Sequence, residues 1–490
     1  MDLKTYKYKM HPGKFGLLAL NDRAFRTFAF FLLLLLSSEV RSQDVVYWSG
    51  SSPNGNWEWG SLCTAAGVDG NWHYTTNGFG ERKRPDCFAT PNTVYFDNTN
   101  YPVMNLNSPD DYTLNQILFV SVTNGRTFNT DASRSIWFKQ NGVNNAKIEN
   151  YVALTTHTFN VEINVDAGTN MEFNPVNGFL AFNNTIYNRS GNTFNVYGAQ
   201  QVTFSGDITT TTGSPGITIN NTATVVYTGV SKTYSGPTTI NSGTTLRISS
   251  NQSLGDIVLN NGGTLLVDAG TTLTINGNWT GGGTIDNNGT IILAGSSAQS
   301  FPGSSGTVSA MNNLTINNAS GVTLDQSMNV DGTLTLSSGT LTLGNNNLTL
   351  GASSPAIAGT LSAANMIVTD GTGQLRKVFT AAGSYVFPVG DASGTTDYSP
   401  ITLNFTSGTF TGAYAAVRVI NAKHPNNAST NNFLSRYWAL SGSGMSGYSC
   451  NINAEFPATD ITGSAANMSV GRWGGSMPWV KGGTVTATTL

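Results

Sequence analysis

The 490-residue sequence predicts an all-β protein, a right-handed parallel β-helix (solenoid) followed by an antiparallel β-sandwich. The first observation is that only 10% of the residues are charged, whereas an ordinary soluble domain has about 25%. Exposed helices usually carry Glu, Lys and Arg on their outer faces, so this composition disfavours long surface helices. The second observation is the 55 glycines, and the third is a Gly-Thr-Leu motif that recurs about every 20 residues, a period typical of solenoids.

Residues 1–42 have the order of a secretory signal peptide. Six basic residues precede an apolar run from Phe28 to Leu36, and small residues follow up to Ser42. The apolar run is too short to cross a bilayer, which takes about 20 residues. We expect cleavage near Ser42 and a secreted or cell-surface chain without a transmembrane segment. That chain would keep 17 basic and 24 acidic residues, a balance that disfavours nucleic-acid binding.

Residues 43–105 predict an aromatic-rich cap at the N-terminal end of the solenoid. Four of the nine tryptophans fall here, namely Trp48, Trp57, Trp59 and Trp72. A solenoid has open ends, and a terminal unit must cover the exposed core with its own large side chains. The alternative is a sugar-stacking platform formed by Trp57, Trp59 and Trp72.

The same segment contains two of the three cysteines. Cys63 and Cys87 stand 24 residues apart, and export permits a disulfide between them. A metal pair is the alternative, with His73 as the nearby third ligand. Cys450 is left over, and we expect it to be a small buried thiol. No metal site and no cofactor are expected.

Residues 106–370 repeat the strand motif and predict the parallel β-helix. The motif begins at Gly243, Gly263 and Gly283, and the same step separates Gly339 from Gly359. Thr and Leu alternate with period two, so Leu should face the core and Thr the solvent. The outward Thr are then strand-favouring surface residues. A flat Thr array for an ordered surface such as ice is disfavoured, because residues 336–338 interrupt one row.

Residues 371–490 predict the antiparallel β-sandwich. The expected strands here are longer and richer in aromatic residues, and turns separate them at intervals of about 10–15 residues. Arg436 and Arg472 stand beside tryptophans in the sequence, so we expect both to make packing or cation–π contacts.

The sequence predicts no catalytic site, so we expect a protein that is not an enzyme. Solenoid enzymes that cleave polysaccharides need carboxylates for acid/base work, or carboxylates with Ca²⁺ and a Lys or Arg base. The nearest pair on one face is Asp268 and Asp286, which no Lys or Arg accompanies in the sequence. His73, His157 and His424 stand far apart without a nucleophile motif. We expect each histidine at the surface or in a turn.

Several motifs resemble known surface proteins. The opening, with Tyr47-Trp48-Ser49-Gly50 and Val94-Tyr95-Phe96-Asp97, resembles the start of autotransporter-associated β-strand repeat proteins. The Gly-Thr-Leu-Thr-Leu ladders, and the module from Phe387-Pro388-Val389-Gly390 to Arg436-Tyr437-Trp438, look like large surface proteins of Bacteroidota exported through the type IX secretion route. Those proteins usually end in a C-terminal sorting domain, and none is visible here, so we expect a partial chain.

The resemblance implies an adhesin-like or structural role at the cell surface. The implied partners are cell-surface glycans or other surface proteins. The alternative function is a carbohydrate-binding or polysaccharide-cleaving β-helix protein, with the tryptophan-rich opening or Asp268 and Asp286 as its working surface.

Overall fold

The structure of the chain is a computed structural model. It describes residues 45–48, 72–73, 92–97, 103–106, 111–121, 124–130, 134–220, 222–303 and 305–490. These residues belong to one compact unit, Asp44–Leu490. Apart from two 3-10 turns at Ala458–Asp460 and Ala465–Asn467, the described residues contain no helix, so the all-β class is confirmed. In this part of the chain no helix has the length and hydropathy that a membrane crossing requires.

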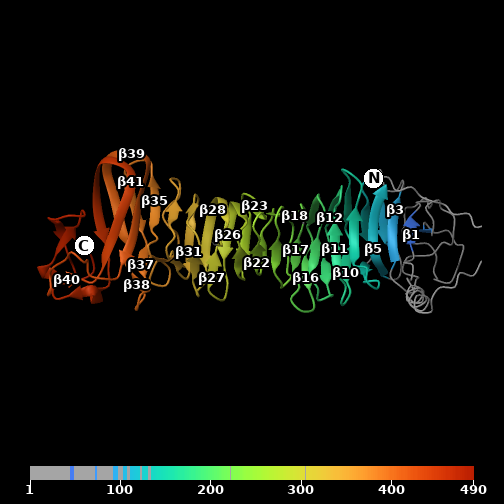
Figure 1. Cartoon of the computed structure of the whole chain (residues 1–490), viewed down its shortest axis with the longest axis horizontal. Coiled ribbons are helices and arrows are strands. Elements are labelled where there is room, and N and C mark those ends of the chain that lie inside the picture. Colours follow the sequence, from blue (N-terminus) through green and yellow to red (C-terminus); the bar gives the residue numbers. More distant parts are fainter. Residues whose placement is uncertain are drawn as a thin grey trace, which may run out of the picture. The chain divides into compact units, whose positions relative to one another are not determined.

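The strands form a parallel β-helix, in which each coil passes through three faces before it returns to the first (Figure 1). Three long strands, β5, β26 and β28, bend at a corner and contribute to two faces.

Face 1 contains β3 (Asn92–Asp97), the second half of β5 (Tyr112–Ser121), β8 (Ala146–Asn150), β11 (Met171–Asn174), β14 (Phe194–Val196), β17 (Ile217–Ile219), β19 (Thr238–Ile240), β22 (Ile257–Leu259), β25 (Trp279–Gly281), β27 (Gln299–Phe301), β29 (Val322–Leu324), β32 (Leu341–Thr342), β34 (Ile367–Val368) and β37 (Val389–Asp391).

Face 2 contains β4 (Val103–Leu106), β6 (Thr127–Thr130), β9 (Thr156–Phe159), β12 (Phe179–Phe182), β15 (Gln201–Phe204), β18 (Thr224–Tyr227), β20 (Thr245–Ile248), β23 (Thr264–Val267), the first halves of β26 (Thr284–Leu293) and β28 (Thr307–Asn317), β30 (Met328–Val330), β33 (Leu348–Leu350) and β35 (Leu375–Phe379).

Face 3 contains the first half of β5, β7 (Ser135–Phe138), β10 (Glu162–Val165), β13 (Ile186–Asn188), β16 (Ile208–Thr210), β21 (Gln252–Leu254), β24 (Thr272–Ile275), the second halves of β26 and β28, and β31 (Leu334–Ser338).

Successive coils stack in register and confirm the predicted parallel β-helix. On face 1, Val196 pairs with Ile219, Ile219 with Ile240 and Ile240 with Leu259. The alternation within each strand is also confirmed. In β20, Leu246 and Ile248 are fully buried, whereas Thr245 is half-buried and Arg247 is exposed. The alternating pattern therefore places the apolar side chains inside the coil.

The length of a coil varies along the stack. In the middle of the stack, Leu246 pairs with Leu265 and Leu265 with Ile285, so each coil there has nearly the predicted length. The predicted step at Gly339 and Gly359 is wrong, because Leu341 pairs with Ile367, well beyond the expected position. The intervening chain forms turns, and Ala358 in this segment makes an isolated bridge to Thr335. An insertion therefore interrupts the repeat at this coil.

The core changes from aromatic to aliphatic along the stack. On face 2 the first coils place fully or almost fully buried rings one above another, with centroids 4.6, 5.0 and 5.3 Å apart. Tyr227 follows these rings in register, and the aliphatic Ile248 and Val267 occupy the same position in the next two coils. Aromatic rings need more room than aliphatic chains, so the ring column accompanies the longer coils. The column consists of Phe128, Phe159, Phe182 and Phe204.

The parallel stack runs on past residue 370. β35 pairs in parallel with β33, and β37 with β34. Antiparallel strands then extend face 2, because β35 pairs with β39, and β39 pairs with both β36 and β41 (Figure 1). The antiparallel strands therefore continue a solenoid face rather than begin a separate sheet, and a β-sandwich stays a prediction.

The strands of this C-terminal region are β36 (Gly383–Phe387), β38 (Asp397–Tyr398), β39 (Ile401–Ile420), β40 (Phe433–Leu434), β41 (Tyr437–Ala454), β42 (Ile461–Thr462), β43 (Ser469–Arg472) and β44 (Val480–Thr484). At the other end, β1 (Val45–Trp48) pairs with β2 (Trp72–His73) and with β3.

Candidate functional site

The predicted N-terminal site residues fall largely beyond the described ranges. Trp57, Trp59, Cys63 and Cys87 lie outside the described residues. Of Trp72 the structure describes the backbone, which pairs with Trp48 between β2 and β1. The disulfide and the sugar-stacking platform therefore stay predictions. Cys450 is a free cysteine that is half-buried rather than buried, and this burial raises the pKa of its thiol.

Asp268 and Asp286 have partners that the sequence did not reveal. Arg247, one coil earlier, donates its Nε–H to both carboxylate oxygens of Asp268 at 3.0 Å. Ser249 also donates to Asp268 at 2.7 Å. The prediction that no basic residue accompanies this pair is therefore wrong, because stacking brings together residues that are distant in the sequence. Asp286 instead accepts a hydrogen bond from Asn288 at 3.0 Å.

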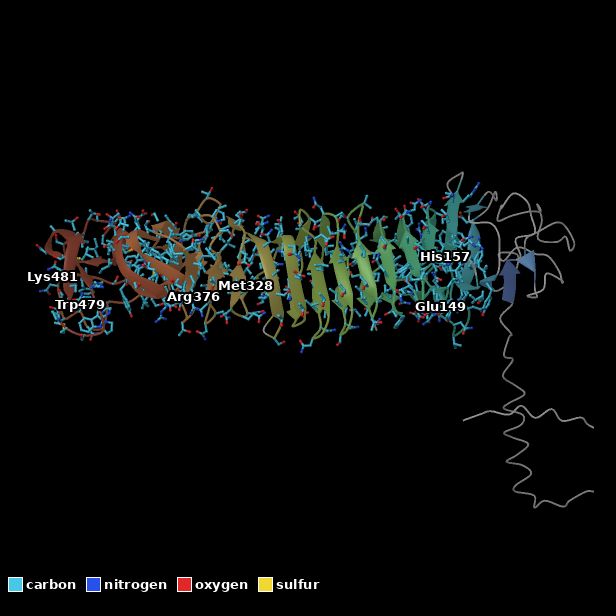
Figure 2. The ribbon with its side chains drawn as sticks, turned by 90° about the horizontal axis from the view of Figure 1, so that it is seen from above. Glu149, His157, Met328, Arg376, Trp479 and Lys481 are labelled. Atoms are coloured by element: carbon cyan, nitrogen blue, oxygen red, sulfur yellow. The ribbon has the colours of Figure 1, made fainter. Side chains whose placement is uncertain are left out.

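His157 lies in the core, which contradicts the prediction of a surface or turn residue. Its ring is fully buried and stacks on Phe119 with centroids 3.5 Å apart. Burial, together with the nearby charge of Arg126, lowers the pKa of His157 to about 3. The side chain is therefore neutral at physiological pH, and its Nδ1 accepts a hydrogen bond from the Arg126 N–H at 3.0 Å. His157 serves the packing of the first coils, near the N-terminal end of the stack in Figure 2.

Arg436 is buried among carboxylates, and it makes no cation–π contact with a described ring. It is fully buried and contacts three carboxylates: Asp391 through Nη1, Asp397 through Nη2 at 2.9 Å and Asp460 through Nε at 2.6 Å. Burial alone would lower the pKa of Arg436, but its hydrogen bonds to Asp460 and Asp391 outweigh this effect and raise it. The cluster ties β37 and β38 to the segment before β42. We therefore assign it a structural role at the C-terminal end of the solenoid.

Many outward asparagines are hydrogen-bonded from coil to coil. Asn241 donates to Asn220 at 2.8 Å, and Asn260 donates to Asn241 at 2.6 Å. Two similar ladders, with donor–acceptor distances of 2.7 to 3.3 Å, join residues 129, 160 and 183 and residues 145, 170 and 192. In these ladders the amides satisfy one another, so little of their hydrogen-bonding capacity remains for a ligand.

On face 2 the outward threonines form one column rather than a flat array. Five of them stand in register on face 2, one per coil, at positions 224, 245, 264, 284 and 307. The neighbouring outward column contains Val226, Arg247, Leu266 and Asp286. This second column mixes apolar and charged groups, so face 2 lacks the second row of threonines that binding to an ordered surface such as ice would require.

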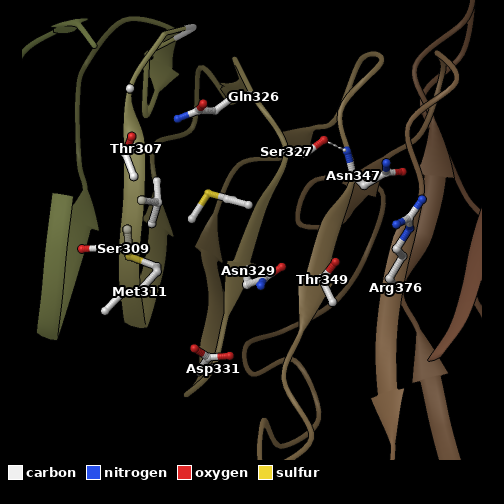
Figure 3. Close-up of a pocket in the computed structure, with 14 residues that line it drawn as sticks. Thr307, Ser309, Met311, Gln326, Ser327, Asn329, Asp331, Asn347, Thr349 and Arg376 are labelled. Atoms are coloured by element: carbon white, nitrogen blue, oxygen red, sulfur yellow. Dashed lines mark hydrogen bonds between the residues drawn. The ribbon is translucent and has the colours of Figure 1, made fainter. Parts of the chain in front are cut away.

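A groove interrupts face 2 between β28 and β30, and we name it the face-2 groove (Figure 3). β28 belongs to one sheet and β30 to the next. The two strands meet where the Asp331 N–H donates to the Met311 carbonyl at 2.9 Å and the Gly332 N–H to the Asn312 carbonyl at 2.8 Å. The groove has a volume of about 460 Å³, within the range of about 300–1,000 Å³ that is usual for small-molecule sites.

A row of polar side chains crosses the groove from coil to coil. Asn329 pairs with Thr349, and Thr349 pairs with Arg376. All three line the groove, as do Gln326 and Asp331 (Figure 3). The Arg376 guanidinium lies 5.0 Å from the centroid of the Tyr414 ring, and its buried Nε has no hydrogen-bond partner among the described residues. The groove therefore presents amide, hydroxyl, carboxylate and guanidinium groups together.

Three polar side chains of the groove are not used by the fold as the ladder amides are, although Ser309, Ser327 and Asn347 do make hydrogen bonds within the fold. The side chains of Gln326, Asn329 and Asp331 make no hydrogen bond to another described residue. This site could not be predicted from the sequence, because no sequence motif marks the interruption between β28 and β30. The only signal available was that Asn329 and Arg376 depart from the Thr that usually occupies outward positions.

Among the residues that the structure describes, no group of three or more His, Cys, Asp or Glu side chains could hold a metal ion. No protein-family model matches this sequence, and neither a curated protein nor a solved structure matches it.

Proposed function

We propose that this chain is an exported, cell-surface β-solenoid with an adhesin-like or structural role and no catalytic activity. The observation that carries the proposal is the coil-to-coil bonding. From β5 to β37, each coil pairs with the next on at least one face, and amide ladders add side-chain hydrogen bonds. A stack in which every coil supports its neighbours resists local opening, as a protein that holds a binding surface away from a cell must.

The surroundings of the acidic pair support the non-catalytic part of the proposal. Asp268 is engaged by Arg247 and Ser249. A general acid or nucleophile in glycoside hydrolysis needs a carboxylate that is free to reach the glycosidic bond. Held by its partners, Asp268 suits a surface ion pair better than this chemistry.

The surface location can be tested on intact cells that make the chain. Proteinase K added from outside should cut it, while a cytoplasmic marker stays whole, and the N-terminal residue of the mature chain should be Gln43. Deleting the gene should reduce attachment of the cells to glycan-coated surfaces, and complementation should restore it. Protection of the chain until lysis, or unchanged attachment, would contradict the proposal. Release of reducing sugar from a polysaccharide would contradict its non-catalytic part.

A further inference from the structure

We propose that the face-2 groove binds an acidic oligosaccharide, with ring hydroxyls on Asn329, Gln326 and Asp331 and a sugar carboxylate on Arg376. The inference names the ligand class of the proposed surface protein, and in that sense it rests on the proposed function. The binding itself is a property of the folded chain and can be measured without cells.

The amide and carboxylate groups of the groove match the hydroxyl groups of a sugar. Adjacent hydroxyls on a pyranose each offer one donor and two acceptor positions. The amides of Asn329 and Gln326 supply both donors and acceptors, and the Asp331 carboxylate accepts only. Because these groups have no hydrogen bond to another described residue, binding a sugar would replace only their water and would not break the fold.

Arg376 carries a positive charge that is available to an acidic ligand. The other described arginines near carboxylates are paired, Arg247 with Asp268 and Arg436 with three aspartates. Arg376 has no ion pair with a described residue, and the Tyr414 ring lies against its guanidinium. A planar guanidinium held in this way matches a carboxylate through two parallel hydrogen bonds.

The spacing of the polar row suits an extended sugar chain, and its charges set the direction in which the chain would lie. The row Asn329–Thr349–Arg376 runs from coil to coil, and neighbouring strands lie about 4.8 Å apart, close to the length of one sugar residue in an extended chain. Asp331 follows Asn329 at the far end of this row and repels a second carboxylate there. The ligand should therefore place its carboxylate at Arg376 and neutral hydroxyls at Asn329. Figure 3 shows Asp331 and Arg376 on different strands, with Thr349 between them.

The apolar part of the lining is consistent with this class of ligand. Met311 and Met328 both line the groove, and Figure 3 labels Met311 there. Methionine adapts its shape to irregular surfaces, and the C–H face of a pyranose ring is such a surface. Met311 is 1% and Met328 5% exposed, so the apolar contact is narrow and the polar row carries the recognition.

Isothermal titration calorimetry on the purified chain tests the inference with a galacturonate trisaccharide and its neutral galactose counterpart. The acidic sugar should bind saturably, at least about 10-fold tighter than the neutral one, with an affinity that falls as salt rises. Arg376→Gln should remove this preference, and Arg376→Lys should restore only part of it because an ammonium lacks the planar fork. Asn329→Ala should weaken both sugars about 10-fold. Thr245→Ala, on the same face outside the groove, should bind like the original chain.

Several results would overturn the inference. They are the absence of saturable binding, equal affinity for the two sugars, or unchanged binding after both Asn329→Ala and Arg376→Gln. Asn329 is exposed, so its truncation leaves the fold intact and keeps the test valid if Arg376→Gln unfolds the antiparallel end. Failure of sugar binding would leave surface exposure on intact cells untouched, so the two proposals can fail separately.

Discussion

The substitution Asn241→Asp tests whether the asparagine ladder holds neighbouring coils together. Asn241 is the middle member of its ladder, donating to Asn220 at 2.8 Å and accepting from Asn260 at 2.6 Å. An aspartate has nearly the same shape but only accepts when ionised. Asn241→Asp therefore keeps the hydrogen bond from Asn260. It replaces the hydrogen bond to Asn220 with a repulsive contact between a carboxylate oxygen and the amide oxygen of Asn220.

The loss of stability expected for Asn241→Asp follows from the lost side-chain N–H donor. A hydrogen bond contributes about 0.5–1.5 kcal/mol, and an unsatisfied partner adds about 1–3 kcal/mol when buried. All three ladder residues are half-buried, so we expect a loss of about 1–3 kcal/mol in the free energy of unfolding. Asn220→Asp is the matched control, because Asn220 only accepts in this ladder and its carboxylate can still do so. We expect its stability to stay within about 0.5 kcal/mol of the original chain, as for most substitutions that break no such contact.

Urea unfolding followed by far-UV circular dichroism measures both variants, and amide hydrogen exchange in β19 and β22 locates the effect. Below about pH 4 the introduced carboxyl takes up a proton and can donate again, so the deficit of Asn241→Asp should shrink. The reasoning is refuted if Asn220→Asp costs as much as Asn241→Asp at neutral pH, or if the deficit of Asn241→Asp persists at pH 3.

Three further substitutions probe the core and the buried charges. Phe182→Ala opens a cavity within the ring column and should cost about 3–5 kcal/mol in urea unfolding, and a loss below about 1 kcal/mol would contradict the column. Arg436→Met leaves three carboxylates without their cation and should cost about 3–5 kcal/mol at pH 7; a loss below about 1 kcal/mol would argue against the charge cluster. Burial lowers the pKa of Lys232 from 10.5 to about 8. As the pH rises, the folded chain therefore releases this proton before the unfolded chain does. Its stability relative to Lys232→Met should therefore rise by up to about 3 kcal/mol from pH 8 to pH 10.5, and a flat difference would rule out the shift.

Local patterns in the sequence predicted most of the architecture. The period-two alternation of Thr and Leu placed Leu246 and Ile248 in the core, because a strand has only two sides and one of them must be apolar. The spacing of the Gly-Thr-Leu motif predicted the coil length where the core is aliphatic. The motif spacing failed at Leu341, where an insertion lengthens the coil before Ile367. An insertion on the surface leaves the strand patterns on either side unchanged, so those patterns do not reveal it.

The sequence could not predict which distant polar residues meet. Arg247 pairs with Asp268 in the next coil, and Arg436 pairs with Asp391 across a much longer stretch of chain. The register that joins them depends on the length of every turn between them, and turn lengths vary along this chain. The face-2 groove has the same origin, because it exists only where two sheets on one face separate between β28 and β30.

The sequence by itself determined that this is an all-β solenoid with few charges. Like positions stack about 4.8 Å apart, and a charge repeated in register would repel its copy, so Thr and Asn fill the outward positions. Only the tertiary structure decided what each outward side chain does. Stacking uses up the amide of Asn241 in a ladder, whereas the separation of two strands leaves the amide of Asn329 without a partner among the described residues. The same residue type is therefore structural in one coil and available to a ligand in another.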